Sequence, residues 1–492
     1  MSSLARVARN TAALAVGNLL TKILSLVFLV YVARRLGDLG FGQFSTAMAL
    51  VGLVSVLPNY LARPYLVREV ARARDRAGRL LDQVALSNLI LSLLVFAGLW
   101  FVGPHFGYDQ VTVKAIALLG FALTFDSVTN SYHAALAGFE RLDYSAVINV
   151  VNTLLTIALG GVILFAHPSL QWLIGAYVAA KALTLVLARR ALRLLAVQTA
   201  VGFNPRLFWT LHTGAWPFFI TTVFVMIYQR LDIVILSFFR RPEEVGYYNA
   251  AYKLMEGMGL LAASFVQAVY PVMSRLFVEQ PDRLALAYRR SLRVLLAFLI
   301  PAAAGLTVAA WDLVPACFGK TFVPAAIALM ILVWGQLLDG LNPLLAQALR
   351  AADRERTVAW IAGAGAASNV ACNLVLIPLF GLYGASVATL ISFGLVLWLN
   401  QREVARVFGR SDIGGPLART VLAALIMAAT MWLLRHYALL NLSIGYRAGA
   451  LVLAGCAAYP IAAVICGVLD REDRRLLGEF VRAKFKRQRT AS

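Results

Sequence analysis

The chain has 492 residues, of which 61% are hydrophobic and only 14% are charged, and its formal net charge is +21. A soluble protein of this length would need far more polar surface, so the composition excludes an ordinary soluble enzyme. The surplus of Lys and Arg does not indicate nucleic-acid binding, because these residues flank apolar blocks, where the positive-inside rule places them. We therefore interpret the chain as a membrane protein.

The apolar residues form about fourteen blocks, each long enough to cross a bilayer as a helix, since roughly 20 apolar residues span the hydrocarbon. The predicted spans are 11–33, 40–62, 82–103, 112–137, 144–166, 169–188, 213–238, 245–274, 292–311, 322–349, 357–379, 382–400, 417–437 and 447–469.

The segments between the spans alternate in charge. The set that includes the N-terminus and the tail after 470 holds 33 of the 45 Lys and Arg, counting two just inside neighbouring helix ends. The positive-inside rule therefore predicts that both termini are cytoplasmic and that the number of spans is even. Two of these segments, 63–81 and the tail, are basic and amphipathic. We interpret them as topology signals with solvated faces; binding to anionic inner-leaflet lipids is the alternative.

The chain also echoes itself. Gly42–Leu50, at the start of span two, resembles Gly246–Leu254, at the start of span eight. In a second echo the partners are 213 residues apart, and they pair Asp126 with Asp339 and Glu140-Arg141 with Asp353-Arg354. A shift of six spans keeps the orientation in the membrane, as in transporters with parallel repeats.

The prediction is an all-α polytopic membrane protein with two six-helix lobes around a central cavity and two extra C-terminal helices. The lobes are residues 1–193 and 194–412, spans 13 and 14 occupy 413–470, and 471–492 form a basic cytoplasmic tail. The four cysteines have no metal spacing, and no Walker loop, HExxH motif or nucleophile elbow is present, so we expect no metal, no cofactor and no enzyme activity.

Several short motifs occur in a moderately specific order, namely Arg9–Thr11, Val32–Gly37, Gly40–Phe44, Leu66–Ala71, Arg230–Leu236 and Val245–Leu254. In these motifs the chain resembles the polysaccharide-exporter (Wzx-like) flippases of the multidrug/oligosaccharidyl-lipid/polysaccharide (MOP) superfamily. The resemblance implies a flippase in the inner membrane that moves undecaprenyl-diphosphate-linked oligosaccharide to the outer leaflet by alternating access. Its partners would be the lipid-linked oligosaccharide, anionic lipids, a polysaccharide polymerase and glycosyltransferases.

Ionisable residues inside spans cost about 2.5–3.5 kcal/mol each at a helix centre, so most should face protein or a wet cavity. A diphosphate head group needs cations at depth. The candidate substrate-binding cations are Lys22, Arg63, Arg230 and Lys253. Of these, Lys22 is the strongest, because no acid lies three or four residues from it within the helix.

Acids inside spans could couple transport to Na⁺ or H⁺, because a buried carboxylate holds a cation in one state and releases it in another. The candidates for ion coupling or for polar cavity lining are Asp126, Asp232, Glu256, Asp339 and Asn18. Structural roles are the alternatives. Asp126 and Asp339 would then be partners of cavity amides, and Lys253 and Glu256 would neutralise each other.

Two further basic residues have expected structural roles. Lys181 lies about eight residues from the cytoplasmic end of its span and is expected to extend its ammonium toward the interface. Arg35 is expected to contribute to outer-loop packing or topology.

Three other functions are weighed. A drug or metabolite cation antiporter of the same superfamily should have a cavity dominated by acids, yet four cations accompany four acids here. A membrane glycosyltransferase or polymerase needs a hydrophilic loop with clustered acids, and the longest loop, 189–212, has none. A flippase for a cell-wall lipid precursor stays open.

Overall fold

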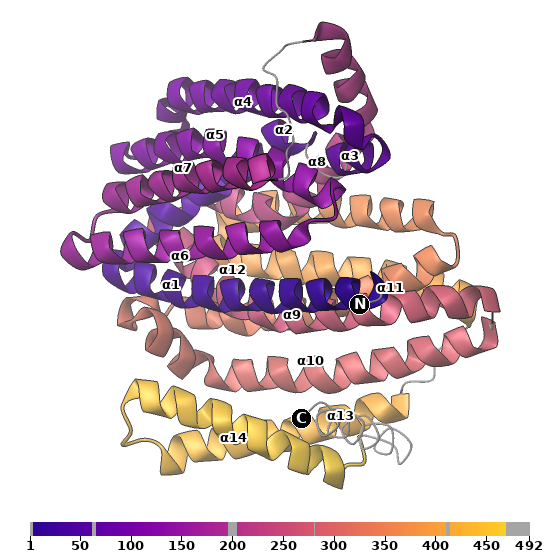
Figure 1. The fold of residues 1–492 in the computed structure, drawn as a ribbon. Coiled ribbons are helices and arrows are strands. Elements are labelled where there is room, and N and C mark those ends of the chain that lie inside the picture. Colours follow the sequence, from indigo (N-terminus) through magenta and orange to yellow (C-terminus); the bar gives the residue numbers. More distant parts are fainter. Residues whose placement is uncertain (1–2, 62–64, 195–203, 280, 410–413, 469–492) are drawn as a thin grey trace, which may run out of the picture. The chain divides into compact units, whose positions relative to one another are not determined.

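The computed structural model describes residues 3–61, 65–194, 204–279, 281–409 and 414–468, and Figure 1 shows these residues as helices joined by short turns. Two short helices are α2 (Val56–Asn59) and α3 (Val67–Arg72). The long helices are α1 (Ser3–Val54), α4 (Ala77–Val102), α5 (Gln110–Gly138), α6 (Leu142–Ala166), α7 (Leu170–Leu194), α8 (Pro205–Phe239), α9 (Pro242–Glu279), α10 (Pro281–Phe318), α11 (Ala325–Ala351), α12 (Glu355–Phe408), α13 (Gly414–Leu433) and α14 (Ile444–Ile465).

Two of these helices are each broken into two arms by a glycine. In α1 the break is at Gly37, with φ +70°, and in α12 it is at Gly381, with φ +57°. Both values lie in the left-handed region, which glycine enters without steric cost. In the described ranges, two arms of α1, two of α12 and ten further long helices make fourteen segments, which agrees with the predicted number of helices.

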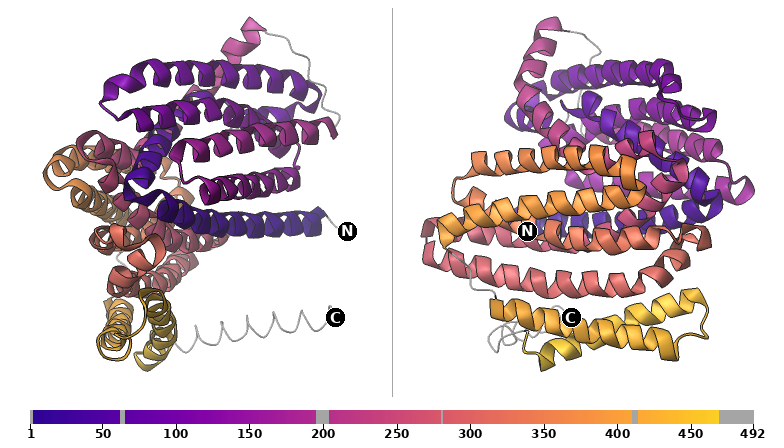
Figure 2. Two further views of the ribbon diagram at one scale, coloured as in Figure 1. Left: turned by 90° about the vertical axis from the view of Figure 1, so that its left-hand side faces the viewer. Right: turned by 180° about the vertical axis from the view of Figure 1, so that it is seen from behind.

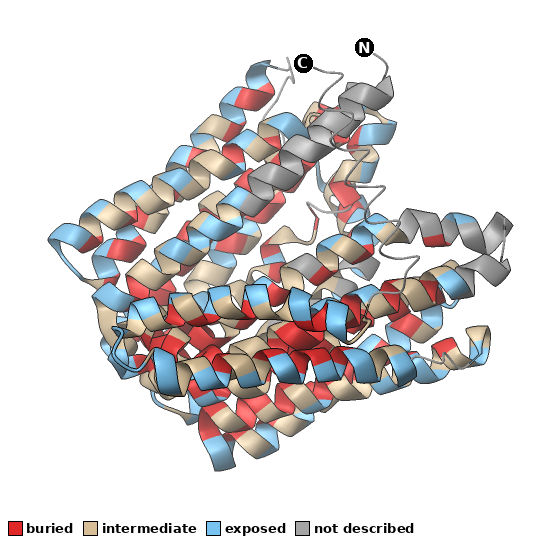
Figure 3. Cartoon of the chain, turned by 90° about the horizontal axis from the view of Figure 1, so that it is seen from below, coloured by how far each residue is buried: buried red, intermediate tan, exposed pale blue. Residues whose placement is uncertain are grey.

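Length and hydropathy support membrane insertion of most of these helices. Within the described residues, nine helices are long and apolar enough to cross a bilayer, or ten if the bent pair Thr222–Tyr228 and Arg230–Phe239 counts as one span. Their exposed positions, pale blue in Figure 3, include many large apolar side chains, such as Phe165 and Ile465. The chain is therefore an all-α, multi-pass membrane protein, as predicted.

The helices separate into two compact units, Met1–Asn249 with Asn369–Ala385, and Ala250–Ser368 with Ser386–Ser492. In the first unit α4 packs on α5, α5 on α7, α7 on α6 and α6 on α1 (Figure 1). In the second unit the antiparallel α13 and α14 (yellow in Figure 2) both pack against α10. Compactness does not test the lobe boundaries at 193 and 412, which rest on the repeat and stay a prediction.

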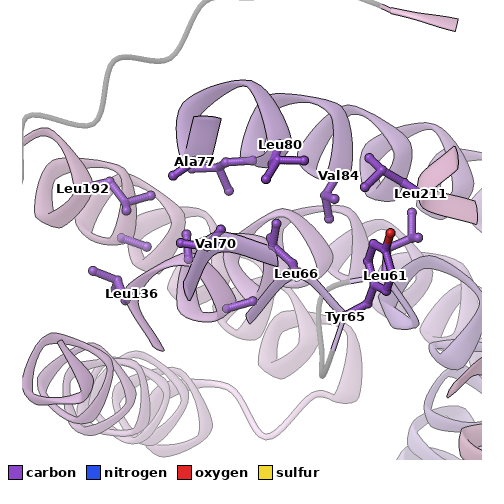
Figure 4. Close-up of a cluster of buried hydrophobic side chains, with 14 of the residues drawn as sticks. Leu61, Tyr65, Leu66, Val70, Ala77, Leu80, Val84, Leu136, Leu192 and Leu211 are labelled. Atoms are coloured by element: carbon purple, nitrogen blue, oxygen red, sulfur yellow. The ribbon is translucent and has the colours of Figure 1, made fainter. Parts of the chain in front are cut away.

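The basic segment after span two is anchored in protein. Leu66 and Val70, on either side of the start of α3, are fully buried in a cluster that includes Leu81, Leu136 and other residues of the first unit, shown in part in Figure 4. The arginines of this segment that the structure describes, from Arg68 to Arg79, are exposed, and Arg74 pairs with Glu140 at 3.2 Å. The apolar face of this segment therefore contributes to the protein core.

The internal repeat is visible in backbone geometry. Among the described residues, only two other than glycine have a positive φ: Glu140, at 62°, and Asp353, at 57°. They are the predicted repeat partners. Each follows a helix end closed by the same type of backbone bond, Arg141 N to Leu136 O and Arg354 N to Leu349 O, both 2.9 Å. This is a Schellman-type helix end with an acid where glycine is usual.

In both copies of the repeat an arginine side chain donates hydrogen bonds to carbonyl oxygens at the end of a helix or helix arm. Arg35 donates from Nη2 to the carbonyl oxygens of Leu164 and Phe165, at 2.8 and 2.9 Å. Arg240 donates to those of Ile377 and Pro378, at 3.3 and 2.8 Å. The acceptors are 213 residues apart, the same shift as the second echo. The expected packing role of Arg35 is confirmed, and the repeat extends to its hydrogen bonds.

The first echo is a direct contact between its two copies. A Cβ on Gly42 would lie 1.7 Å from Pro242 O, and a Cβ on Gly246 would lie 2.9 Å from Asp38 O. In the repeat register Asp38 corresponds to Pro242 and Gly42 to Gly246. The contact of Gly42 with Pro242 is therefore repeated, with the two copies interchanged, as the contact of Gly246 with Asp38. Asn249 Nδ2 also donates to its own counterpart, Ser45 Oγ, at 2.7 Å. Such reciprocity is the property of a two-fold interface.

We expect Gly42→Ala to destabilise the protein by about 1–3 kcal/mol, because the added methyl group cannot fit unless the helices separate. Gly52→Ala is the matched control, since Gly52 lies in the same helix with no atom within 4 Å of an added Cβ. Thermal unfolding of both purified variants measures the difference. Equal melting temperatures for the two variants would contradict the close packing described here.

Candidate functional site

Lys22 lies in the first arm of α1 and its side chain is exposed. In the described part of the chain its ammonium makes no hydrogen bond or ion pair. Ser25, one turn later, is also exposed, together with the apolar side chains of Leu20, Ile23 and Val27. Asn18 lies on α1 one turn earlier, but its side chain is outside the described part.

Arg230 and Asp232 lie in α8, two residues apart, and have different surroundings. Asp232 is buried and accepts hydrogen bonds from Tyr248 Oη at 2.5 Å and from Ile233 N at 2.8 Å. Arg230 is half-buried, and its guanidinium has no ion pair with any described residue. Tyr248, rather than Arg230, is therefore the hydrogen-bonding partner of this carboxylate.

Lys253 and Glu256 form an ion pair on α9, with Nζ 2.6 Å from Oε2. The Lys253 side chain is 23% exposed. Its charge is already neutralised by one carboxylate of the same helix. This geometry fits the structural alternative for the pair. The remaining predicted cation, Arg63, lies outside the described residues.

Asp126 and Lys181 form the centre of a polar network in the first unit. Lys181 Nζ lies 2.5 Å from Asp126 Oδ1, and the Lys181 side chain is only 14% exposed. Asn130 Nδ2 contacts both Asp126 Oδ2, at 3.4 Å, and Asn59 Oδ1, at 3.1 Å. The expectation that Lys181 extends toward the interface is wrong, because a carboxylate on α5 stabilises the ammonium within the protein.

Asp339, the repeat partner of Asp126, has no such cation. The residue that corresponds to Lys181 is Gly394, and no described Lys or Arg pairs with Asp339. Its hydrogen-bond partner is Asn342, one turn along α11. Asn342 in turn accepts from Asn400 Nδ2 at 3.4 Å. The two equivalent acids therefore differ: a lysine neutralises Asp126, whereas the partner of Asp339 is the amide of Asn342.

A groove of about 350 Å³ lies between α10, α11, α13 and the end of α12, all in the second unit. Apart from Gln401 its lining is apolar, with residues such as Leu296, Leu337 and Leu425. None of the predicted site residues lines it. Such a surface suits a hydrocarbon chain, and it provides no group for a charged head group.

Sequence reasoning missed two polar residues. Tyr248 was quoted only as part of a motif, although a phenol one helix away from a buried acid is a common partner. Arg240 could have been found from the paired arginines, because Arg34-Arg35 and Arg240-Arg241 each come shortly before one copy of the first echo. Most other partners join residues far apart in the sequence, and no local pattern indicates them.

We expect Lys181→Met to destabilise the protein by about 2–3 kcal/mol, below the range for a fully buried pair, because the Asp126 side chain is 35% exposed. The double variant Asp126→Leu/Lys181→Met should regain most of this loss, since no unpaired charge remains. Thermal unfolding of the single and double variants tests the pair. A double variant less stable than the single one would contradict it.

Comparison with known proteins agrees with these features. Residues 7–277, more than half of the chain, match the family described as polysaccharide biosynthesis protein, and residues 217–375 match the MatE family. The probable low-salt glycan biosynthesis flippase Agl15 of Haloferax volcanii is 22% identical over 459 residues, which cover 90% of this chain and 94% of that protein. A candidate O-antigen transporter of Shigella flexneri is 21% identical, covering 78% of this chain and 96% of that protein.

Among solved structures, the lipid II flippase MurJ in an inward closed conformation superposes with a TM-score of 0.76 at 15% sequence identity. The alignment covers 92% of this chain and 98% of MurJ, so the fold is shared along almost the whole length. The sequence matches and this fold agree on one assignment: the chain belongs to the polysaccharide biosynthesis protein family of flippases, within the MOP superfamily.

Proposed function

We propose that this flippase moves an undecaprenyl-diphosphate-linked oligosaccharide from the inner to the outer leaflet of the cytoplasmic membrane by alternating access. The product would supply surface polysaccharide synthesis, with both termini of the chain in the cytoplasm. Transport of this kind needs no bond chemistry, so the protein acts as a transporter and not as an enzyme. The family supports the class of function; the substrate and the mechanism are the proposal.

The observation that carries the proposal concerns Lys22 and Arg230, although the nearby carboxylate of Asp232 offsets part of the Arg230 charge. Both lie within predicted spans and neither has an ion pair with a described residue. An uncompensated charge at the centre of a span costs about 2.5–3.5 kcal/mol. A diphosphate is the anion that offsets this cost, because Lys and Arg donate strong charge-assisted hydrogen bonds to phosphate oxygens. Lys253 is a weaker candidate, since Glu256 already neutralises it.

Replacing Lys22 or Arg230 by Ala should abolish polymer export while the protein still accumulates in the membrane. Lys114→Ala is the control, because Lys114 is an exposed cation near the predicted outer end of α5. Export is measured as surface polymer in a strain that depends on this flippase, together with the lipid-linked oligosaccharide left in the inner leaflet. Normal export in both variants would overturn the assignment of the cations.

Alternating access requires a contact that opens and closes, and the reciprocal contact of α1 with α9 is the candidate. It joins equivalent turns of the two repeats at their predicted outer ends. We expect a disulfide in the variant Ser45→Cys/Asn249→Cys to stop transport and reductant to restore it, because the two side chains are in contact. Each single cysteine variant is the control. Full transport by the oxidised double variant would show that this contact stays closed throughout the cycle.

Asp339 is the proposed ion-coupling residue, for H⁺ or Na⁺. Of the two equivalent acids it is the one that pairs with no described Lys or Arg, so its carboxylate can exchange a bound ion without breaking such a pair. In proteoliposomes with an imposed H⁺ or Na⁺ gradient, Asp339→Asn should lose the dependence of transport on the gradient. The double variant Asp126→Leu/Lys181→Met should keep it. Unchanged gradient dependence in Asp339→Asn would exclude Asp339 as the coupling site.

A further inference from the structure

The second unit contains a charged cluster that the proposed transport does not use. Asp312, near the end of α10, is fully buried and receives two arginines. Arg435 Nε lies 2.6 Å from its Oδ2, and Arg447 Nε lies 2.6 Å from its Oδ1. One carboxylate therefore orients two guanidinium groups side by side and neutralises only one of them.

The surplus charge has free donors. Each arginine uses its Nε on Asp312, and in the described part of the chain the Nη groups of both donate to no protein acceptor. The two side chains are 25% and 20% exposed, so these donors are accessible from one side. The neighbouring segments 305–325 and 431–450 contain no acid other than Asp312. Two guanidinium groups that share one carboxylate carry a net positive charge, and their remaining N–H donors suit the oxygens of a phosphate group.

Local backbone geometry supports the same site. Arg435 lies in η5 (Leu434–Ala438), a π-helical turn that follows α13, and such turns are frequent at functional sites. Arg447 lies in the first turn of α14, whose N-cap Ser443 provides no side-chain hydrogen bond. A cation at a helix N-terminus is unfavourable unless an anion is close. Asp312 supplies one negative charge, and it is shared between Arg447 and Arg435.

Aromatic side chains set the depth of the cluster. Each charged residue lies beside exposed rings: Trp311 is 38% exposed, Trp432 48%, Tyr437 78% and Tyr446 74%. Exposed Trp and Tyr at the ends of spans mark the level of lipid head groups. Within the same unit, α13 and α14 continue from this level with exposed apolar side chains such as Leu425, 60% exposed, and Leu453, 72% exposed. A lipid bound here would place its phosphate at the two arginines and its acyl chains along the apolar surface of the helices.

We infer that Arg435 and Arg447, oriented by Asp312, bind the phosphate group of an anionic membrane lipid at the ends of α10, α13 and α14. The site is separate from the unpaired cations of α1 and α8 and does not rest on the proposed transport. The lipid phosphate would complete the charge balance of the cluster and stabilise the attachment of the last two helices to α10.

The test is lipid-dependent stabilisation of the full chain in detergent, with native mass spectrometry to count bound lipid. Phosphatidylglycerol should raise the melting temperature of the unaltered protein more than phosphatidylcholine or inorganic phosphate does. Arg435→Gln should bind phosphatidylglycerol about tenfold more weakly, the order expected for one lost charge-assisted fork, while Asp312 keeps Arg447 as its partner. Arg447→Gln is the reciprocal variant if the first does not fold.

The control is Arg406→Gln, which removes one charge from an exposed pair with Glu403 in the same unit. A purely structural cluster would lower the melting temperature without lipid in Arg435→Gln but leave the increment from phosphatidylglycerol unchanged. Equal increments in all three proteins would overturn the inference. Stabilisation by inorganic phosphate equal to that by phosphatidylglycerol would overturn the assignment to a lipid.

Discussion

The hydrocarbon of a bilayer solvates neither backbone polar groups nor charges, and this constraint determines where the chain can place them. Backbone groups are satisfied within helices, so each charge needs a side-chain partner or water. Asp126 has Lys181, Lys253 has Glu256, and Asp232 has Tyr248. Residues without such a partner are therefore the informative ones.

The two copies of the repeat share the hydrogen bonds that close equivalent helix ends. Helix ends at Leu136 and Leu349 close with the same backbone bond, although an acid in the left-handed region costs about 1 kcal/mol more than glycine would. Arg35 and Arg240 satisfy carbonyl groups at equivalent helix ends. These bonds use the unsatisfied groups that every helix end has, so the repeat is conspicuous in hydrogen bonds even where residues differ.

Much of the fold follows from the sequence because the bilayer imposes one length and one periodicity on each span. The number of helices was predicted correctly for this reason. The repeat shift of 213 residues was also predicted correctly, from residues that match at that spacing. Long-range partners were not predictable. Lys181 lies 55 residues from Asp126, and its distance from the end of the helix indicated only that it could reach the interface. Similarly, the many arginines of segment 63–81 indicated a solvated face, and the burial of Leu66 and Val70 was not predicted.

The halves are alike in backbone and unlike in charge, and the difference has a physical reason. The contacts of Gly42 and Gly246 are reciprocal within the first unit, as expected where equivalent turns of a repeat meet. A lipid with one anionic head group has no such symmetry, so identical charges in both halves would leave one set unmatched. Lys181 opposite Asp126, with Gly394 at the corresponding place near Asp339, removes the charge of one acid and leaves the other available. Equivalent packing with unequal charge therefore fits the proposed substrate, a lipid with a single anionic head group.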